Sequence, residues 1–238
     1  MAFDKFLPAE PSPNPLLLSS ICYYYIIMEQ NISTIRNWLG TGSINIFGLP
    51  FAGKDTVGIR LADDLGAKFL SSGLILRHSA ENDQELAKEM NSGLLASTDK
   101  FSEIILPYFA MPELRNFPLI LSSVGRWEGE EYPVIETCES TNHPIKAVIL
   151  LNISESEARK RRDVAETLMD RGARQDDKDL IVFDKRVEEF IQKTMPVIET
   201  YRKRNLLVSI TATADRDTVY SNVVAGLLEK AAEDTTSA

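Results

Sequence analysis

Short apolar runs alternate with stretches of helical periodicity along most of the chain. Five runs predict strands: Ile44–Phe47, Ala67–Leu70, Leu119–Ser122, Ala147–Asn152 and Leu206–Thr211. The helical stretches begin at Lys54, near Ile75, near Asp99, near Tyr132, at Ser154 and near Lys178, and a last helix runs from about Asp215 to Lys230. Because strands that alternate with helices form a mostly parallel sheet covered on both faces, the predicted fold class is α/β.

Residues 1–42 form a separate helical extension in this pattern. Pro15 suits the first position of a helix and Gly40 suits its end. The apolar run Leu16–Met28 is well short of the roughly 20 apolar residues that a membrane-spanning helix needs. We therefore expect a packed or interface helix and no membrane span, with membrane contact as the alternative. Because Tyr23–Tyr25 cover most of a helical turn, the three rings cannot all face one core, and self-association through this helix is one interpretation.

The composition is that of a globular protein with an acidic balance. Hydrophobic residues make up 44% of the 238 residues and charged residues 26%, and the formal net charge is −9. An acidic balance disfavours nucleic-acid binding through a broad basic surface. Cys22 and Cys138 form no C-x-x-C pair, and together with two histidines they argue against a zinc site. We expect a cytoplasmic protein without zinc, and a small polar tail at residues 232–238 that frays.

The segment Ile44–Thr56, INIFGLPFAGKDT, carries the clearest chemical signal. It reads as a strand, a glycine-containing loop and a helix, and Gly48 to Lys54 satisfies the pattern G-x-x-x-x-G-K. Backbone N–H groups of such a loop converge where the helix dipole favours an anion, and the lysine adds a mobile cation. The next residue is Asp55, where the pattern has Ser or Thr. The segment predicts a phosphate-binding loop, with an ordinary strand–helix turn and a surface lysine as the alternative.

Gly48–Thr56 also resembles the GxPGAGKGT loop of adenylate kinases and related nucleoside monophosphate kinases. Further segments resemble motifs of that family in the same order: Ser71–Arg77 (SSGLILR), Asn91–Leu95 (NSGLL), Leu119–Arg126 (LILSSVGR), Arg174–Asp177 (RQDD) and Thr194–Tyr201 (TMPVIETY). The chain is thus identified as a divergent member of the family. The resemblance implies a P-loop fold with a five-stranded parallel sheet in residues 43–231, an acceptor-binding insert at about 72–100 and a short lid at about 163–173.

The resemblance further implies that the chain transfers the γ-phosphoryl group of Mg–ATP to a nucleoside monophosphate, with AMP as the favoured acceptor. The implied ATP-binding residues are Gly48, Pro50, Ala52, Gly53, Lys54, Asp55 and Thr56, and the implied acceptor-binding residues are Ser72, Gly73, Arg77, Gly93, Leu95, Arg126 and Glu130. The implied catalytic residues are Lys54, Arg126, Arg161, Arg174 and Arg186, with Asp176 and Asp177 orienting the arginines. This set suits the reaction, because phosphoryl transfer depends on positioning and on charge neutralisation by Lys, Arg and magnesium.

Three positions depart from the family pattern close to the phosphates. Phe51 and Asp55 replace loop glycines, and Ser122 stands where the family has an aspartate that orders magnesium-bound water. At Phe51 the loop either holds a backbone compatible with a side chain or changes shape. Because a carboxylate is lost at the third strand and gained at the loop, we expect Asp55, with Thr56, to help hold Mg²⁺.

The base of the acceptor is a separate question. The adenine-reading glutamine of the family falls close to Glu130, and a carboxylate accepts hydrogen bonds without donating any, which suits an amino group and a ring N–H such as those of guanine. The alternative is a solvated residue in the acidic run 128–131. Two other functions stay open: a P-loop kinase of another small metabolite, and a nucleotide-binding regulator in which Phe51, Asp55 and Ser122 have removed turnover.

Overall fold

The computed structural model describes residues 15–168 and 179–236, with side chains for residues 26–165 and 179–236. Within this part the strands are β1 (Ser43–Gly48), β2 (Lys68–Ser71), β3 (Leu119–Ser122), β4 (Ile145–Asn152) and β5 (Leu207–Thr211). They form one sheet in the order β2-β3-β1-β4-β5, and every neighbouring pair is parallel. The predicted α/β class and the five-stranded parallel sheet are confirmed.

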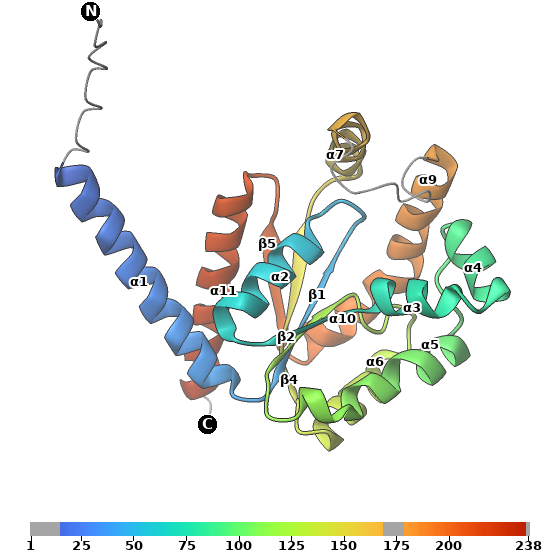
Figure 1. Cartoon of the computed structure of the whole chain (residues 1–238), viewed down its shortest axis with the longest axis horizontal. Coiled ribbons are helices and arrows are strands. Elements are labelled where there is room, and N and C mark those ends of the chain that lie inside the picture. Colours follow the sequence, from blue (N-terminus) through green and yellow to red (C-terminus); the bar gives the residue numbers. More distant parts are fainter. Residues whose placement is uncertain (1–14, 169–178, 237–238) are drawn as a thin grey trace, which may run out of the picture.

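Each face of the sheet carries its own hydrophobic core, because successive side chains of a strand point to opposite faces. On one face, Ile46 and Ile149 pack with residues of α1 (Pro15–Leu39), α2 (Lys54–Leu65) and α11 (Arg216–Thr236). On the other face, Phe47 and Leu150 pack with residues of the remaining helices. These helices are α3 (Ser72–Ala80), α4 (Gln84–Asn91), α5 (Thr98–Ile105), α6 (Glu131–Ser140), α7 (Glu155–Leu168), α9 (Leu180–Glu189) and α10 (Met195–Lys203). Figure 1 shows how they surround the sheet.

The strand order explains where a site forms. β1 pairs with β3 on one side and with β4 on the other, so the loops that follow β1 and β3 leave the same edge of the sheet. The backbone links them directly, since Ser123 N–H donates to the Ile46 carbonyl over 3.0 Å. The Asn45 side chain adds two hydrogen bonds to Val124, one to its carbonyl (2.7 Å) and one from its N–H (3.3 Å). The segment after β3 is thereby held against the loop after β1.

The N-terminal helix begins at Pro15 and ends before Gly40, as the sequence predicts. Ile32, Ile35 and Leu39 are buried in its second half, where α1 contacts α11 and α2. Its first half projects away from the rest of the protein in Figure 1. None of the described helices is long and apolar enough to span a membrane. The side chains of Tyr23–Tyr25, on which the predicted self-association depends, lie outside those that the structure describes.

The C-terminal helix extends further than the sequence pattern predicts. α11 continues to Thr236, whereas the expected end was near Lys230 and residues 232–238 were expected to fray. Tertiary contacts account for the difference: Lys230, which is only 6% exposed, pairs with Asp234, and the indole N–H of Trp38 donates to the same carboxylate over 3.1 Å. This segment consists mainly of small and polar residues, and that composition does not indicate that one of them has a partner on α1.

Candidate active site

The loop between β1 and α2 has the geometry of a phosphate cradle. Gly53 adopts the left-handed conformation (φ 91°) immediately before Lys54 opens α2, so the first turn of the helix faces the loop. The Lys54 ammonium group donates to the carbonyls of Gly48 and Leu49 over 2.8 and 3.0 Å. This arrangement combines the positive end of a helix dipole with a lysine that can turn towards an anion. These contacts fit the predicted phosphate-binding loop, whose role in binding nucleotide stays a prediction.

Phe51 holds the conformation of the glycine that it replaces. Its φ is +64°, in the left-handed region that residues with a Cβ avoid at a cost of about 1–2 kcal/mol. The side chain is 7% exposed and its ring lies 6.0 Å from that of Phe183 on α9, at an interplanar angle of 48°. Burial against α9 offsets the backbone strain. Of the two expectations for this position, the compatible backbone is the one observed.

A first cleft opens between the loop after β1, the helix α3, the loop after β3 and α9. It is lined by every residue that the resemblance implies for acceptor binding, and by Pro50, Gly53, Lys54, Asp55 and Arg186. Gly93 needs to be glycine here, because its φ is +81° and a Cβ would lie 2.7 Å from the Val182 carbonyl. Ser72 shapes the cleft through a hydrogen bond from its hydroxyl to the Ser123 carbonyl (2.6 Å). Residues from four separate motifs thus converge on one cavity, together with Glu130 and Arg186.

Arginines make this cleft a site for anions. Arg126 lies close to Arg186, and burial together with this like charge lowers the pKa of Arg126 to about 10. The guanidinium is still protonated at neutral pH, because this value lies well above 7. Its Nε is buried and has no hydrogen-bond partner among the described residues. An anionic ligand would stabilise this arrangement, because it accepts a hydrogen bond from the buried N–H and offsets the repulsion between the two arginines. The planar guanidinium group also has the right shape to form two hydrogen bonds to a phosphate group.

Glu130 lies inside the first cleft and is only 2% exposed, so the solvated alternative is wrong. Its Oε2 accepts the backbone N–H groups of Arg126 (2.7 Å) and Trp127 (3.0 Å), which fixes the carboxyl group at the start of α6. Burial raises the pKa of Glu130, against the opposing effects of these two N–H groups, the Thr98 hydroxyl and Arg126. Its Oε1 is buried and lacks a well-aligned hydrogen bond within the described part of the chain. The described part of the chain thus leaves hydrogen-bonding capacity on that oxygen unused.

Asp55 and Ser122 are in direct contact. The Ser122 hydroxyl donates to Asp55 Oδ1 over 2.7 Å, and both residues line the first cleft. The carboxylate on α2 therefore lies beside the end of β3, where the family motif carries its own aspartate. The role of Asp55 in holding Mg²⁺ stays a prediction.

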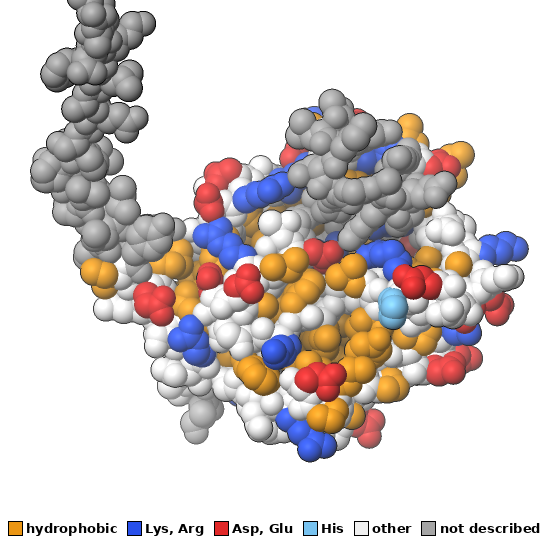
Figure 2. Space-filling model, viewed as in Figure 1, with side chains coloured by type: hydrophobic (Ala, Val, Ile, Leu, Met, Phe, Trp, Pro, Cys, Tyr) orange, Lys and Arg blue, Asp and Glu red, His pale blue; other side chains and the backbone are white. Residues whose placement is uncertain are grey.

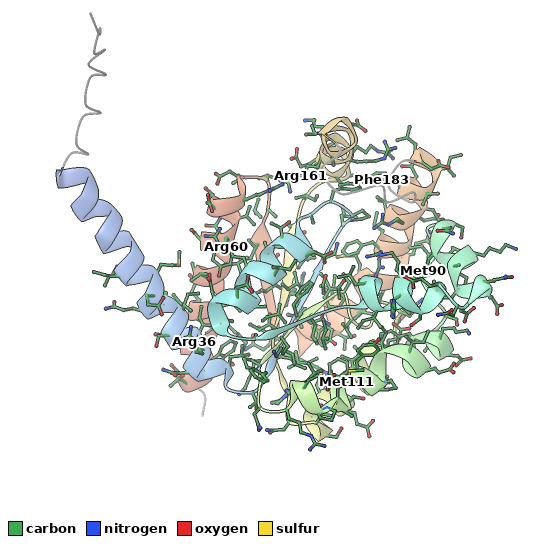
Figure 3. The ribbon with its side chains drawn as sticks, viewed as in Figure 1. Arg36, Arg60, Met90, Met111, Arg161 and Phe183 are labelled. Carbon is green, nitrogen blue, oxygen red and sulfur yellow. The ribbon has the colours of Figure 1, made fainter. Side chains whose placement is uncertain are left out.

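A second cleft lies on the other side of the phosphate loop and shares Phe51 and Gly53 with the first. Ala52 and Thr56 line it, together with the α7 residue Arg161. Arg161 donates to the Ala212 carbonyl (2.6 Å) and to Glu157 (2.9 Å), so it lies apart from the Arg126 and Arg186 cluster. Figure 3 labels Arg161 and Phe183 on the neighbouring helices α7 and α9. Figure 2 shows several Lys and Arg side chains in the upper half of this face, on the same side as these two helices.

Some expected residues lie outside the described part of the chain. These are Arg174, Asp176 and Asp177, together with residues 169–173 of the expected lid. The first residues of that lid, 163–168, are helical and continue α7. The roles of Arg174, Asp176 and Asp177 stay predictions.

The structure also reveals cleft residues that the sequence analysis did not identify. Trp127 lines the first cleft, and Arg60 and Tyr220 line the second. The Arg60 guanidinium lies 3.9 Å from the centre of the Tyr220 ring and is held by Asp217 over 2.7 Å. Arg60 and Tyr220 lie on two helices far apart in sequence, so no local pattern could have paired them.

Comparison with known proteins agrees with this geometry, although no protein-family model matches the chain. An adenylate kinase of Agrobacterium fabrum is 30% identical over 190 residues, which cover 77% of this chain and 96% of that enzyme. An adenylate kinase of Synechococcus sp. (strain CC9902) is 31% identical over 169 residues, or 69% of this chain and 87% of that enzyme. One of Methanocella arvoryzae is 22% identical over 209 residues, which cover 76% of this chain and 96% of that enzyme. The chain therefore belongs to the adenylate kinase family of P-loop phosphotransferases.

Proposed function

We propose that this kinase transfers the γ-phosphoryl group of Mg–ATP to AMP. The observation that carries the proposal is the position of the phosphate loop between two clefts, which share Phe51 and Gly53. In the first cleft, Arg77, Arg126 and Arg186 suit the phosphate of an acceptor. The second cleft, which Arg60, Arg161 and Arg216 line, extends the loop on the side of Thr56. A donor in the second cleft would present its terminal phosphate to Lys54 and to an acceptor in the first. The names of the related enzymes support AMP as the acceptor.

The donor side has groups for both ends of ATP. The loop N–H groups and the Lys54 ammonium group suit the phosphates. Because the lysine side chain is flexible, its charge can stay close to the phosphoryl group during transfer. Arg161 and Arg60 border the second cleft, where they suit the base and ribose of the nucleotide. Closing such a site over both substrates excludes water, which otherwise accepts the phosphoryl group.

The acceptor side has groups for the α-phosphate and for the base. Arg77 and Arg126 suit the phosphate, and Arg186 suits the charge that is shared between donor and acceptor during transfer. Glu130 Oε1 suits an exocyclic amino group, since an ionised carboxylate only accepts hydrogen bonds. Adenine offers one such group, whereas guanine offers an amino group and a ring N–H together.

The residues beside the phosphate loop also fit Mg²⁺. The described residues contain no cluster of three His, Cys, Asp or Glu side chains that could bind a metal alone. Mg²⁺ ordinarily takes one or two protein oxygens and completes its shell with phosphate and water, so Asp55, Ser122 and Thr56 are sufficient. When bound, Mg²⁺ would neutralise charge on the phosphates. Asp55 and the Ser122 hydroxyl would orient that shell from the protein side.

Replacing Asp55 by asparagine tests this assignment. We expect the Mg²⁺ concentration for half-maximal activity to rise about tenfold, because an amide keeps the size of the side chain and removes its charge. Mn²⁺ binding to the ADP complex, followed by electron paramagnetic resonance, should weaken by a similar factor. Asp63→Asn, on the exposed side of the same helix, is the matched control. Unchanged metal titrations of Asp55→Asn would remove Asp55 from the metal site.

The proposed reaction is tested by mixing Mg–ATP with AMP, GMP, CMP or UMP separately and quantifying every nucleotide. Turnover of AMP to ADP is the expected result. Preferred turnover of GMP would keep the reaction class and show that Glu130 reads guanine. ATP binding without transfer to any of the four would overturn the proposal and favour the regulator.

A further inference from the structure

The base end of the first cleft is held by two hydrogen bonds from side chains to backbone. Glu189 Oε2 accepts the Leu95 N–H over 3.2 Å, and the Trp127 indole N–H donates to the Ala96 carbonyl over 3.0 Å. Leu95, Ala96 and Trp127 all line the cleft, next to Glu130. Both contacts therefore determine where one wall of the cleft lies.

Glu189 and Trp127, whose side chains form these two hydrogen bonds, both contact Lys193. The Lys193 ammonium group lies 2.6 Å from Glu189 Oε2 and 3.7 Å from the centre of the Trp127 ring. Glu189 is 2% exposed, and an ionised carboxylate at such a position needs a cation or several hydrogen bonds to remain charged. Arg126 and Lys185 also act on this carboxylate, but Lys193 makes the short ion pair with it. Lys193 at the same time packs on the indole face, which is a favourable cation–π geometry.

The helix that carries both residues changes its winding at this point. Glu189 is the last residue of α9, and Lys193 belongs to the π-helical segment η3 (Phe190–Thr194), which continues into α10. Single-turn π segments inside helices are rare and occur frequently at functional sites. Arg186, one turn before Glu189, lines the first cleft itself. One continuous helical segment thus contributes a cleft arginine and, further along, the pair that contacts Leu95 and Trp127.

Neither Glu189 nor Lys193 lines the cleft, so neither is a contact for the substrate. We infer that they are positioning residues, which hold the Leu95–Ala96 backbone and the Trp127 ring in the shape that receives the acceptor base. The inference rests on the proposed function, because it assigns the cleft wall to the acceptor. It predicts that loss of the pair weakens acceptor binding and leaves the donor side intact.

The experiment measures nucleotide binding by tryptophan emission. The chain has two tryptophans, and Trp38 is bound to Asp234 on α11, so a Trp38→Phe background isolates Trp127 in the cleft. AMP is titrated into this background and into its Lys193→Met and Lys193→Arg variants, and the Kd is confirmed by calorimetry. We expect Lys193→Met to raise the Kd and KM for AMP about tenfold, as for loss of a partly buried cation–π contact, with kcat and the KM for ATP within about twofold. Lys193→Arg should restore binding, because arginine also pairs with carboxylate and indole.

A matched control distinguishes the proposed positioning role of Lys193 from the effect of removing any lysine that neutralises the charge of Glu189. Lys185 lies 3.9 Å from Glu189 Oε1 and pairs mainly with Glu188 over 2.8 Å, whereas the cation over the Trp127 ring is Lys193. Lys185→Met should therefore leave AMP binding within about twofold of the parent. Glu189→Gln should speed hydrogen exchange of the Leu95 amide and weaken AMP binding, while ATP binding shows that the variant is folded.

The outcomes distinguish this inference from the proposed function. If the parent binds AMP and Lys193→Met binds it equally well, the inference is wrong and the kinase assignment stands. If the parent neither binds nor phosphorylates AMP, GMP, CMP or UMP, the proposed function and the inference both fail. An equal loss of AMP and ATP binding in Lys193→Met would indicate a general structural role and would also overturn the inference.

Discussion

Replacing Lys54 by methionine is expected to lower kcat for phosphoryl transfer about a thousandfold, since preorganised charge at the transferring group is the main source of catalysis in this chemistry. Lys54 lines the first cleft and donates to the carbonyls of Gly48 and Leu49, so its ammonium group is already held at the loop. Methionine keeps most of the length of the side chain and removes its charge. Single-turnover measurements with saturating ATP and AMP would give the rate of the chemical step.

Lys68→Met is the matched control for this substitution. Lys68 lies at the start of β2, at the edge of the sheet opposite the clefts, where its ammonium group packs over Phe117 at 4.4 Å. The control should retain the parent rate. A Lys54→Met variant that keeps more than about a tenth of the parent rate would show that the loop N–H groups alone neutralise the phosphates.

Replacing Arg126 by methionine is expected to raise the KM for AMP about 100-fold, because charge-assisted bidentate bonds to phosphate are among the strongest in proteins. The Nε of Arg126 is buried without a hydrogen-bond partner among the described residues, and the neighbouring Arg186 carries the same charge. A bound anion can therefore accept hydrogen bonds from this guanidinium group and offset the repulsion between the two arginines. Arg126→Lys should show a smaller increase, of about tenfold, because it keeps the charge and loses the planar fork. Steady-state kinetics with each substrate varied in turn would separate these effects.

The KM for ATP should change little in both Arg126 variants, because Arg126 lines the first cleft and not the second. Arg115→Met, at an exposed position just before β3, is the control. Equal increases in the KM for ATP and for AMP would contradict the division of the two clefts between donor and acceptor.

Local sequence was sufficient for the sheet and for the candidate phosphate loop, whereas the family resemblance supplied the other residues of the candidate site. Apolar runs such as Leu119–Ser122 coincide with strands, since a strand buried on both faces needs a continuous hydrophobic stretch. The glycine pattern from Gly48 to Lys54 identifies its loop for a similar reason, because the backbone conformation depends on residues within a few positions. The grouping of Ser72 with Arg126 was implied by the family resemblance. The parallel topology accounts for it, because it brings the carboxyl ends of neighbouring strands to one edge.

Only the tertiary structure decided the contacts that join these motifs. Glu130 belongs to an acidic run that resembles a solvated surface, and its burial depends on the start of α6 packing beneath the cleft. The Ser122–Asp55 contact, the Glu189–Lys193–Trp127 group and the position of Arg161 beside Ala212 join residues that are far apart in sequence or lie on different elements. Periodicity and spacing report on neighbours along one element, whereas side-chain partners across elements are selected by packing, for which one sequence carries no local signal.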